Sequence, residues 1–229
     1  MTDLLQSQLE YYRARAEEYD EWFLRKGRYD RGATLNQQWF FEVEEVRRWL
    51  VEQGELGDVL ELAAGTGLWT ERLLSQSRSI HGVDAAPEVL DINRARVRAH
   101  AGRISYELAD LFQWRPGRRF DTVFFGFWLS HVPDSRFDGF WQLVADALKP
   151  AGRAVLVDSL ADPSSTATDH VLEASGEVTR RLNDGREFRI VKKFWEPEPL
   201  TQALQLRGWK PALRRTAHYF LYGSVRRIV

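Results

Sequence analysis

An aliphatic segment that ends in a glycine turn constrains the fold of this chain more than any other feature. Residues 58–69 read DVLELAAGTGLW. The aliphatic run stops at Glu61, small residues follow from Ala63 to Gly67, and a helical pattern then resumes. A strand, a small-residue turn and a helix in this order are typical of the first unit of a parallel α/β sheet, where the turn lets a ligand approach the backbone closely.

Strand-like and helix-like segments alternate from this turn to Ser159. The segments IHGVD, ISYELAD, FDTVFFGF and RAVLVDS read as strands, WTERLLSQ, PEVLDINRARVRAH and DSRFDGFWQLVADAL as helices, and KPAG as a turn. FDTVFFGF is almost entirely apolar, as expected of a strand that helices cover on both faces. The alternation predicts an α/β fold with a doubly wound, mostly parallel sheet.

Two helical patterns precede the alternation and predict an N-terminal helical cap over residues 1–54. The apolar stripe of the first helix consists of Leu5, Leu9, Tyr12, Ala16, Tyr19 and Phe23. The stripe of the second helix consists of Trp39, Val43, Val46 and Leu50, and this helix ends near Gly54. Spacings of three and four residues place each set on one helix face.

The rest of the chain, residues 55–229, is predicted to form one core with a β-hairpin inserted at about 176–195. Val178 to Phe194 reads as two strands around Asp184-Gly185, which is a strong tight-turn signal. Two further strands, WKPALRRTA and HYFLYGSVRR, meet near Ala217-His218 and should pair antiparallel. They bring the predicted sheet to seven strands.

Composition excludes several classes of function. The chain has no Cys, which removes disulfides and every mechanism with a Cys nucleophile. The formal net charge is −1, so no global field favours nucleic acid or an anionic membrane. The N-terminus does not read as a signal peptide, no run reaches the length of a membrane span, and no cluster of acids suggests a metal. We expect a cytoplasmic protein without nucleic-acid or membrane partners, either a monomer or a homodimer.

The glycine turn itself departs from the dinucleotide-binding fingerprint. That fingerprint requires a third small residue after G-x-G, whereas Gly67 is followed by Leu68, Trp69 and Thr70. The polar residues around the turn are more informative. Asp84 ends the second predicted strand, and Asp110 follows the third.

Several segments, taken in order, resemble the motifs of the class I S-adenosylmethionine-dependent methyltransferases. They are VLELAAGTGLWT, GVDAAPEVL, YELADLFQW, FDTVFFGFWLSHVP and LKPAGRAVLVDS, and the resemblance covers about residues 58–159. It implies a Rossmann-like methyltransferase fold, S-adenosyl-L-methionine as the cofactor, and transfer of its methyl group to an acceptor.

The resemblance also implies which residues bind the cofactor. They are Glu61, Ala63, Gly65, Gly67, Asp84, Ala85, Asp110, Leu111, Gly126 and Phe127, together with Arg13 for the cofactor's carboxylate. Asp84 should accept from the ribose hydroxyls and Asp110 from the adenine amino group. Ala63 replaces the family's first glycine, and we expect its φ to be negative because alanine disfavours positive φ.

The acceptor is predicted to be small and aromatic or apolar, methylated on O, N or C. The segment after the fourth strand, Gly126-Phe127-Trp128-Leu129, lacks the Asn/Asp-Pro-Pro-aromatic motif of enzymes that methylate exocyclic base amines. The first helix is a candidate lid, with Tyr12 and Tyr19 lining the transfer channel. His131 is the candidate base, since an imidazole titrates near neutrality, and Asp158 is a weaker candidate.

Two alternatives remain open from the sequence. The same site could transfer or cyclise the aminocarboxypropyl arm of the cofactor, because geometry alone decides which carbon is attacked. The chain could also be a non-catalytic module that binds S-adenosylmethionine, with exposed Trp39, Phe40 and Phe41 forming an interface.

Overall fold

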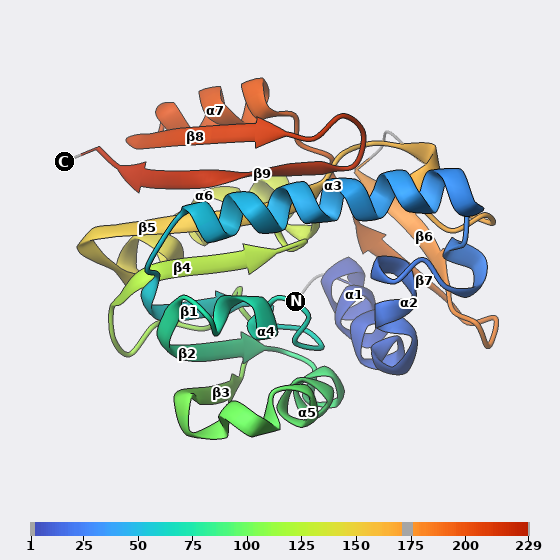
Figure 1. The fold of residues 1–229 in the computed structure, drawn as a ribbon, viewed down its shortest axis with the longest axis horizontal. Helices are drawn as coiled ribbons and strands as arrows, with labels where there is room; N and C mark the ends of the chain where they lie inside the picture. The colour runs from blue at the N-terminus through green and yellow to red at the C-terminus, as the bar shows by residue number, and fades with distance from the viewer. Residues whose placement is uncertain (1–2, 171–175, 229) are drawn as a thin grey trace.

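A seven-stranded sheet in the order β3-β2-β1-β4-β5-β9-β8 forms the central layer of the computed structural model, which describes residues 3–170 and 176–228 (Figure 1). The strands are β1 (Gly57–Leu62), β2 (Ser77–Asp84), β3 (Ile104–Leu108), β4 (Phe120–Gly126), β5 (Leu148–Ser159), β8 (Trp209–Arg215) and β9 (Phe220–Arg227). Strands β1 to β5 are parallel, whereas β9 runs antiparallel to both β5 and β8. The predicted doubly wound sheet with antiparallel closing strands is confirmed.

Helices cover both faces of this sheet. On one face, α3 (Ala33–Glu52) and α4 (Thr70–Leu73) share an apolar cluster with the strands. On the other, α6 (Asp134–Ala147) and α7 (Pro197–Gln205) do the same. Figure 1 shows α3 crossing in front of the sheet and α6 behind it. The helix α5 (Pro87–Arg96) packs beside β2.

The long helix α3 buries the stripe that its spacing predicts. Trp39, Val43, Val46 and Leu50 are all at most 2% exposed. The suggestion of an interface that includes Trp39 is therefore wrong for that residue, because its indole is 0% exposed and packs against the sheet cluster. Phe40 and Phe41 do lie exposed on the outer side of this helix.

The first predicted helix is broken into three pieces. These are α1 (Asp3–Ala14), a 3₁₀ turn (Ala16–Glu18) and α2 (Tyr19–Phe23). Tyr11 packs into a cluster with the hairpin, whereas Ala16 packs against α5, so the two halves of the stripe have different partners. A break in the helix lets each half reach its own partner.

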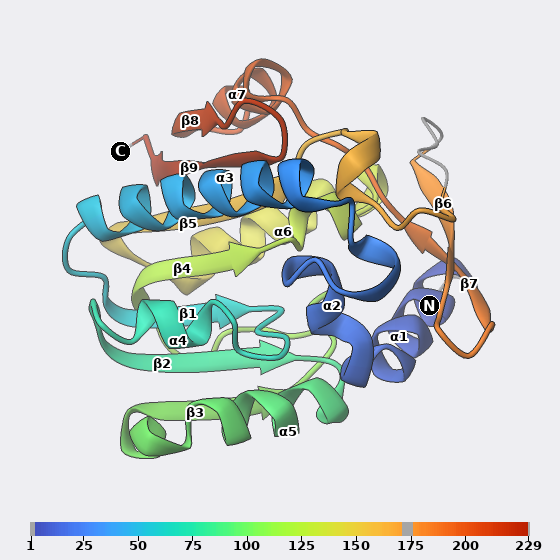
Figure 2. The ribbon, with the colours of Figure 1, turned by 45° about the vertical axis from the view of Figure 1, so that its right-hand side comes forward.

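The predicted hairpin forms between β6 (Glu177–Arg181) and β7 (Glu187–Val191). Gly185, at φ +90°, closes the loop, and its N–H donates to the Leu182 carbonyl at 3.0 Å. The hairpin and the helices α1 and α2 lie together beyond the carboxyl ends of the parallel strands (Figures 1 and 2). Both insertions thus cover the edge of the sheet where ligands bind in such folds.

Three predicted boundaries differ from the structure. The segment KPAG is not a free turn, because it lies within β5 at a point where the pairing with β4 shifts register. The helix after the glycine turn is only α4, since β2 already begins at Ser77. The helix predicted to reach His100 ends as an α-helix at Arg96 and continues as a 3₁₀ turn.

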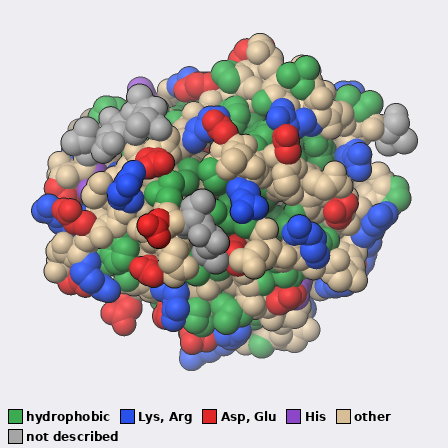
Figure 3. All heavy atoms as spheres, turned by 180° about the vertical axis from the view of Figure 1, so that it is seen from behind, with side chains coloured by type: hydrophobic (Ala, Val, Ile, Leu, Met, Phe, Trp, Pro, Cys, Tyr) green, Lys and Arg blue, Asp and Glu red, His purple; other side chains and the backbone are tan. Residues whose placement is uncertain are grey.

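Within the described ranges, 3–170 and 176–228, no helix combines the length and apolarity needed to cross a bilayer. On the face shown in Figure 3, acidic and basic side chains are interspersed.

Candidate functional site

The glycine turn follows β1 and adopts left-handed backbone at three positions. Ala63, Gly65 and Gly67 have φ values of +52°, +54° and +88°. The expected negative φ for Ala63 is wrong, because the chain has to reverse sharply directly after the buried strand. A left-handed conformation costs an alanine on the order of 1 kcal/mol, which the surrounding contacts have to offset.

Gly65 and Gly67 differ in what a side chain at each position would contact. A Cβ on Gly65 would make only ordinary contacts, at 3.9 Å from the Ala63 carbonyl and the Tyr19 ring, so no clash within the protein requires glycine there. A Cβ on Gly67 would lie 2.7 Å from Oδ1 of Asn93. Gly67 is therefore required by packing within the protein. Gly126 is similar, since a Cβ there would lie 2.9 Å from the Trp69 ring.

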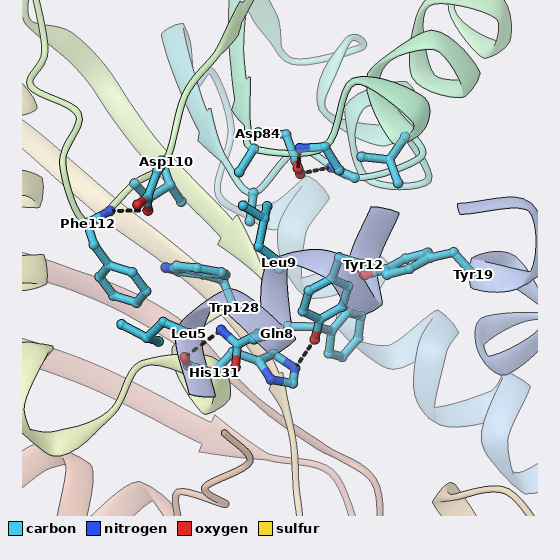
Figure 4. Close-up of a pocket in the computed structure, with 18 residues that line it drawn as sticks. Leu5, Gln8, Leu9, Tyr12, Tyr19, Asp84, Asp110, Phe112, Trp128 and His131 are labelled. Atoms are coloured by element: carbon cyan, nitrogen blue, oxygen red, sulfur yellow. Dashed lines mark hydrogen bonds between the residues drawn. The ribbon is translucent and has the colours of Figure 1, made fainter. Parts of the chain in front are cut away.

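Asp84, at the end of β2, holds the turn in place. Its carboxylate accepts from the Gly65 N–H at 2.9 Å and from the Ala86 N–H at 3.0 Å (Figure 4). Burial raises the pKa of Asp84, and these backbone donors act against that rise. Each oxygen accepts one of these bonds, which leaves lone pairs for a ligand in the adjoining cavity.

Beneath the turn lies a buried polar network that the sequence reading missed. Asn93 of α5 is 0% exposed and donates to the carbonyls of Ala64 and Gly65 at 3.2 and 3.1 Å. It also donates to Thr70 Oγ1, which in turn donates to Glu61 at 2.7 Å. Asn93 sits among apolar neighbours on the inner face of its helix, and this position was the signal that could have identified it.

Glu61 is the charged group closest to the base of this network. Burial, opposed in part by the Thr70 hydroxyl, raises its pKa to about 8. The carboxyl is therefore largely protonated at neutral pH. A cationic ligand placed nearby would favour the ionised form.

The main cavity opens above the turn, has a volume of about 770 Å³ and is mostly apolar. It brings together most of the residues predicted from sequence: Tyr12, Tyr19, Ala63, Gly65, Asp84, Ala85, Asp110, Leu111, Gly126, Phe127 and His131. Glu61 and Gly67 line a smaller adjoining cavity of about 380 Å³. No Lys or Arg is among the residues that line either cavity.

Asp110 and its neighbours form the far side of the main cavity. The Asp110 carboxylate accepts from the Phe112 N–H at 3.0 Å and from the Gln113 side chain at 2.8 Å. Phe112 packs against Trp128, with ring centroids 5.5 Å apart (Figure 4). The two rings, inclined at 38° to each other, make an apolar aromatic wall beside an acceptor group, which suits a heteroaromatic ligand.

Tyr12 and His131 form a hydrogen-bonded pair in the wall of the main cavity (Figure 4). His131 Nδ1 lies 2.7 Å from the Val191 carbonyl, which can only accept, so Nδ1 carries the proton. Nε2 is then the acceptor for the Tyr12 hydroxyl, 2.7 Å away. Burial, followed by the charge of Lys192, holds the pKa of His131 well below its usual range.

Gln8 holds the backbone on either side of the Tyr12–His131 pair in place. The sequence did not identify this residue. Its side chain donates to the His131 carbonyl at 3.2 Å and accepts from the Val191 N–H at 3.0 Å. It is 4% exposed and joins α1 to β7. A buried glutamine on the helix face that carries Leu5 and Tyr12 was the available signal.

The structure does not bring Arg13 to the cavities. Arg13 points outward and pairs with Glu88 at 3.0 Å, with half of its side chain exposed. Three and four residues separate helix neighbours, so Tyr12 faces inward and the adjacent Arg13 cannot. Asp158 is also withdrawn from both cavities: its carboxylate is buried and accepts from the Ser130 and Ser159 N–H groups at 2.8 and 2.7 Å.

A second cavity of about 600 Å³ adjoins the main cavity. The two share a wall made of Tyr12, Tyr19, Phe127 and His131. Phe127, at φ +57°, stacks edge-on against Trp22 with centroids 4.7 Å apart, which extends this wall. The far side of the second cavity comes from the hairpin, through Arg180 and Lys192.

The part of the chain that the structure describes holds no group of three or more His, Asp or Glu placed to bind a metal ion.

Curated proteins resemble part of the chain. A family model described as "Methyltransferase domain" matches residues 59–152. The demethylmenaquinone methyltransferase of Tropheryma whipplei (strain Twist) is 32% identical over 101 residues, which are 44% of this chain and 41% of that protein. The ubiquinone biosynthesis O-methyltransferase of Xanthomonas euvesicatoria pv. vesicatoria (strain 85-10) is 30% identical over 66% of this chain and 61% of that protein. The chain thus spans less than two thirds of the length of either relative.

Solved structures resemble the chain over almost its full length. The DhpI-SAM-HEP complex is 36% identical, with a TM-score of 0.78 over 99% of each chain. The DhpI-SAH complex is 35% identical, with the same TM-score over 99% of this chain and 98% of that chain. The glycopeptide N-methyltransferase MtfA complexed with sinefungin shares the fold, with 18% identity and a TM-score of 0.60 over 81% of this chain and 94% of that chain.

Proposed function

The chain belongs to the class I S-adenosylmethionine-dependent methyltransferases, and we propose that it transfers the methyl group of S-adenosyl-L-methionine to a small molecule held in the second cavity. The observation that carries this proposal is the wall that the two cavities share. A cofactor in the main cavity and an acceptor in the second would meet across Tyr12, Tyr19 and Phe127.

The charges of the main cavity fit this cofactor. S-adenosylmethionine carries a sulfonium and an ammonium group, and the ionisable acids that line the two cavities are Asp84, Asp110 and Glu61. A bound cation would favour the ionised form of Glu61. A pyrophosphate would need cations or free amides, and the Gly65 N–H already donates to Asp84. The fit therefore favours a cationic adenosyl ligand over a dinucleotide.

Each wall then has a role in binding. We assign Asp84 to the ribose hydroxyls and Asp110 with Leu111 to the adenine ring, which would lie against Phe112. The cavity beside Gly65 receives the methionine portion, near Glu61. Ala85, Gly126 and the remaining turn residues supply backbone surface.

The bound cofactor supplies an electrophilic methyl group with a good leaving group already attached. The chain has to hold the acceptor in line with that methyl at near-attack distance and exclude water. Helices α1 and α2 cover the cavities, which supports the cap of residues 1–54 as a lid. Tyr12 and Tyr19 would border the path between the two ligands.

Two finer features complete the proposal. The interspersed surface charge and the balanced composition support a protein without nucleic-acid partners that acts in the cytoplasm as a monomer or homodimer. The names of the curated relatives, which refer to menaquinone and ubiquinone biosynthesis, support the aromatic acceptor that the sequence predicts.

Calorimetry with S-adenosylhomocysteine tests the cofactor site. We expect binding by the wild type and a loss of about tenfold or more in affinity for Asp84→Ala, because a charge-assisted hydrogen bond contributes about 1.5–3 kcal/mol. Asp91→Ala is the matched control, since Asp91 lies on the exposed side of α5. Binding of NAD in preference to S-adenosylhomocysteine would contradict the proposal.

Mass spectrometry of the spent cofactor separates the possible reactions. S-adenosylhomocysteine as the product indicates methyl transfer, whereas methylthioadenosine indicates use of the aminocarboxypropyl arm. Tight binding without turnover across a broad panel of acceptors would favour a non-catalytic module.

A further inference from the structure

Three basic side chains line the second cavity: Arg15 from the end of α1, Arg180 from β6 and Lys192 from the end of β7. Among the residues that the structure describes, 3–170 and 176–228, none that lines this cavity is an Asp or a Glu. The alternation in the hairpin strand explains how Arg180 enters, because it shares the inward face with Val178, while Arg181 points out. Although the hairpin segment is basic in sequence, Arg180 is 8% exposed and the side chain of Lys192 is 11% exposed, so neither lies on a solvated face.

The two guanidinium groups, of Arg15 and Arg180, have no carboxylate partner in the part of the chain that the structure describes. Arg15 lies over the rings of Tyr11 and Tyr19, at 5.5 and 5.0 Å from their centroids. Arg180 is 8% exposed and donates to a neighbouring backbone carbonyl, that of Thr179, at 3.3 Å. Among residues 3–170 and 176–228, no carboxylate forms an ion pair with either guanidinium.

Lys192 is held in a similar way. Its ammonium donates to the hydroxyls of Ser130 and Ser159 at 2.9 and 2.8 Å. The nearest carboxylate oxygen, Oδ1 of Asp158, is 4.0 Å away and accepts from the N–H and the hydroxyl of Ser159. Burial lowers the pKa of Lys192 to about 8, opposed by the charge of Asp158 and reinforced by the guanidinium groups of Arg180 and Arg15.

Such an arrangement is costly when empty. Removing several like charges from water without enough counter-charge disfavours the folded state. An anion in the cavity would offset that cost and would gain charge-assisted hydrogen bonds. His170 adds a further donor, because its Nε2 accepts from the Arg181 N–H at 3.1 Å and the neutral ring then carries its proton on Nδ1.

We propose that the acceptor is a small organic acid whose oxyanion, a carboxylate or a phosphorus oxyanion, binds among Arg15, Arg180 and Lys192. The enzyme converts this oxyanion to its methyl ester. The proposal rests on the methyltransferase function proposed above. The oxyanion oxygen attacks the methyl carbon. The O–C bond forms as the C–S bond breaks, and its electron pair stays on sulfur. The balance needs no proton transfer, because the acid is already ionised.

The hydrogen bonds of His131 agree with this assignment. A hydroxyl acceptor would need a base, yet the Nε2 lone pair of His131 is taken by the Tyr12 hydroxyl and its Nδ1 by the Val191 carbonyl. An oxyanion needs no base. The hydrogen-bonded pair of Tyr12 and His131 then holds in place the wall that the two cavities share.

The carboxylate of the cofactor is another source of negative charge for this cavity. Calorimetry separates the two sources. Protein saturated with S-adenosylhomocysteine is titrated with acetate, methylphosphonate and neutral acetamide. We expect the acids to bind at least tenfold more tightly than acetamide, which has nearly the shape of acetate.

Substitution locates the anion. Arg180→Gln should weaken binding of the acids about tenfold or more and change the affinity for S-adenosylhomocysteine less than twofold. Arg181→Gln, on the same strand and exposed, should leave both unchanged. If Arg180→Gln misfolds, Arg15→Gln provides the same comparison. Equal binding of acetamide and acetate, or a loss confined to S-adenosylhomocysteine, would overturn the proposal.

Methyl transfer from labelled cofactor gives the second readout, with a panel of small carboxylic acids, phosphonic acids, phenols and catechols. If the label is found in an ester that alkali readily hydrolyses, the acceptor is a carboxylate. If the label is found in a phosphorus ester that is stable to alkali, the acceptor is a phosphorus oxyanion. Label in phenol ethers alone would overturn the oxyanion assignment while leaving the methyltransferase intact. Failure to bind S-adenosylhomocysteine at all would instead contradict the proposed function.

Discussion

Individual residues around the glycine turn are fixed by two different demands. Gly67 is needed because Asn93 fills the space where a Cβ would stand, whereas Gly65 lines the main cavity. Motif reading treats the two glycines alike. The difference depends on a residue of α5 that lies 26 positions further on, so sequence spacing alone could not separate the packing glycine from the ligand glycine.

Gly67→Ala should destabilise the fold by roughly 2–4 kcal/mol, because it combines a positive φ with a contact of 2.7 Å to Asn93. Urea unfolding measures the loss. Gly117→Ala is the control, since a Cβ there meets nothing within 4 Å. Equal effects of the two substitutions would contradict the steric account.

Glu61 predicts a pH dependence of stability. Its pKa of about 8 in the folded state lies above the ordinary value of 4.5. At a pH between these two values, Glu61 is therefore protonated in the folded state and ionised in the unfolded state. The free energy of unfolding should therefore fall as pH rises from 5.5 to 8, by at most about 3 kcal/mol.

Glu61→Gln should flatten that decline, because the amide cannot ionise. Urea unfolding without cofactor at pH 5.5 and pH 8 provides the measurement. Glu71→Gln, at an exposed position of α4, should keep the wild-type slope. A slope that survives in the Glu61 variant would assign the pH dependence to other groups.

At the scale of elements, the parallel strands could be predicted and the N-terminal cap only in part. Strands β1, β4 and β5 contain continuous buried segments that their apolar sequences predict, whereas β2 and β3 are partly exposed and follow from the alternation of strands and helices. The break after α1 could not be read from its spacing, because Tyr11 and Ala16 pack on partners far away in sequence. The inward face of β6 could have been read from Val178 and Arg180, which alternate with exposed residues.

Helix α1 packs on the hairpin through an apolar cluster around Tyr11, and the buried Gln8 adds hydrogen bonds to this contact. Gln8→Ala removes the bonds to the His131 carbonyl and to the Val191 N–H and leaves both groups without a partner. We expect hydrogen exchange in α1 and β7 to accelerate about tenfold, as a loss of about 1.4 kcal/mol of local stability implies.

Gln6→Ala is the control for that measurement. Gln6 bonds Glu10 on the exposed side of the same helix, so its loss should leave the exchange of β7 unchanged. Equal acceleration in both variants would mean that Gln8 does not hold the helix.

For the whole molecule, the arrangement of charge separates two ligands. Acids border the main cavity and bases border the second, with aromatic rings between them. The acidic side was predictable from Asp84 and Asp110, because they end consecutive strands. The basic side was not, because Arg15, Arg180 and Lys192 come from three elements that only the tertiary fold brings together.

Ligand binding should raise the stability of the whole fold. S-adenosylhomocysteine at one hundred times its Kd should add about 2.7 kcal/mol to the free energy of unfolding, or roughly 5–10 °C in Tm for a chain of this size. Thermal denaturation followed by circular dichroism measures the shift. NAD at the same concentration should produce none, and an equal shift with NAD would contradict the assignment of the main cavity.

The position of β9 has a consequence for how the chain acquires its structure. This strand follows every other strand in sequence, yet it fills the place between β5 and β8. During synthesis, the edges of β5 and β8 that pair with β9 stay unpaired until β9 leaves the ribosome. A nascent polypeptide halted before Phe220 would leave two strand edges with unpaired N–H and C=O groups. Such a stalled product should aggregate or require a chaperone.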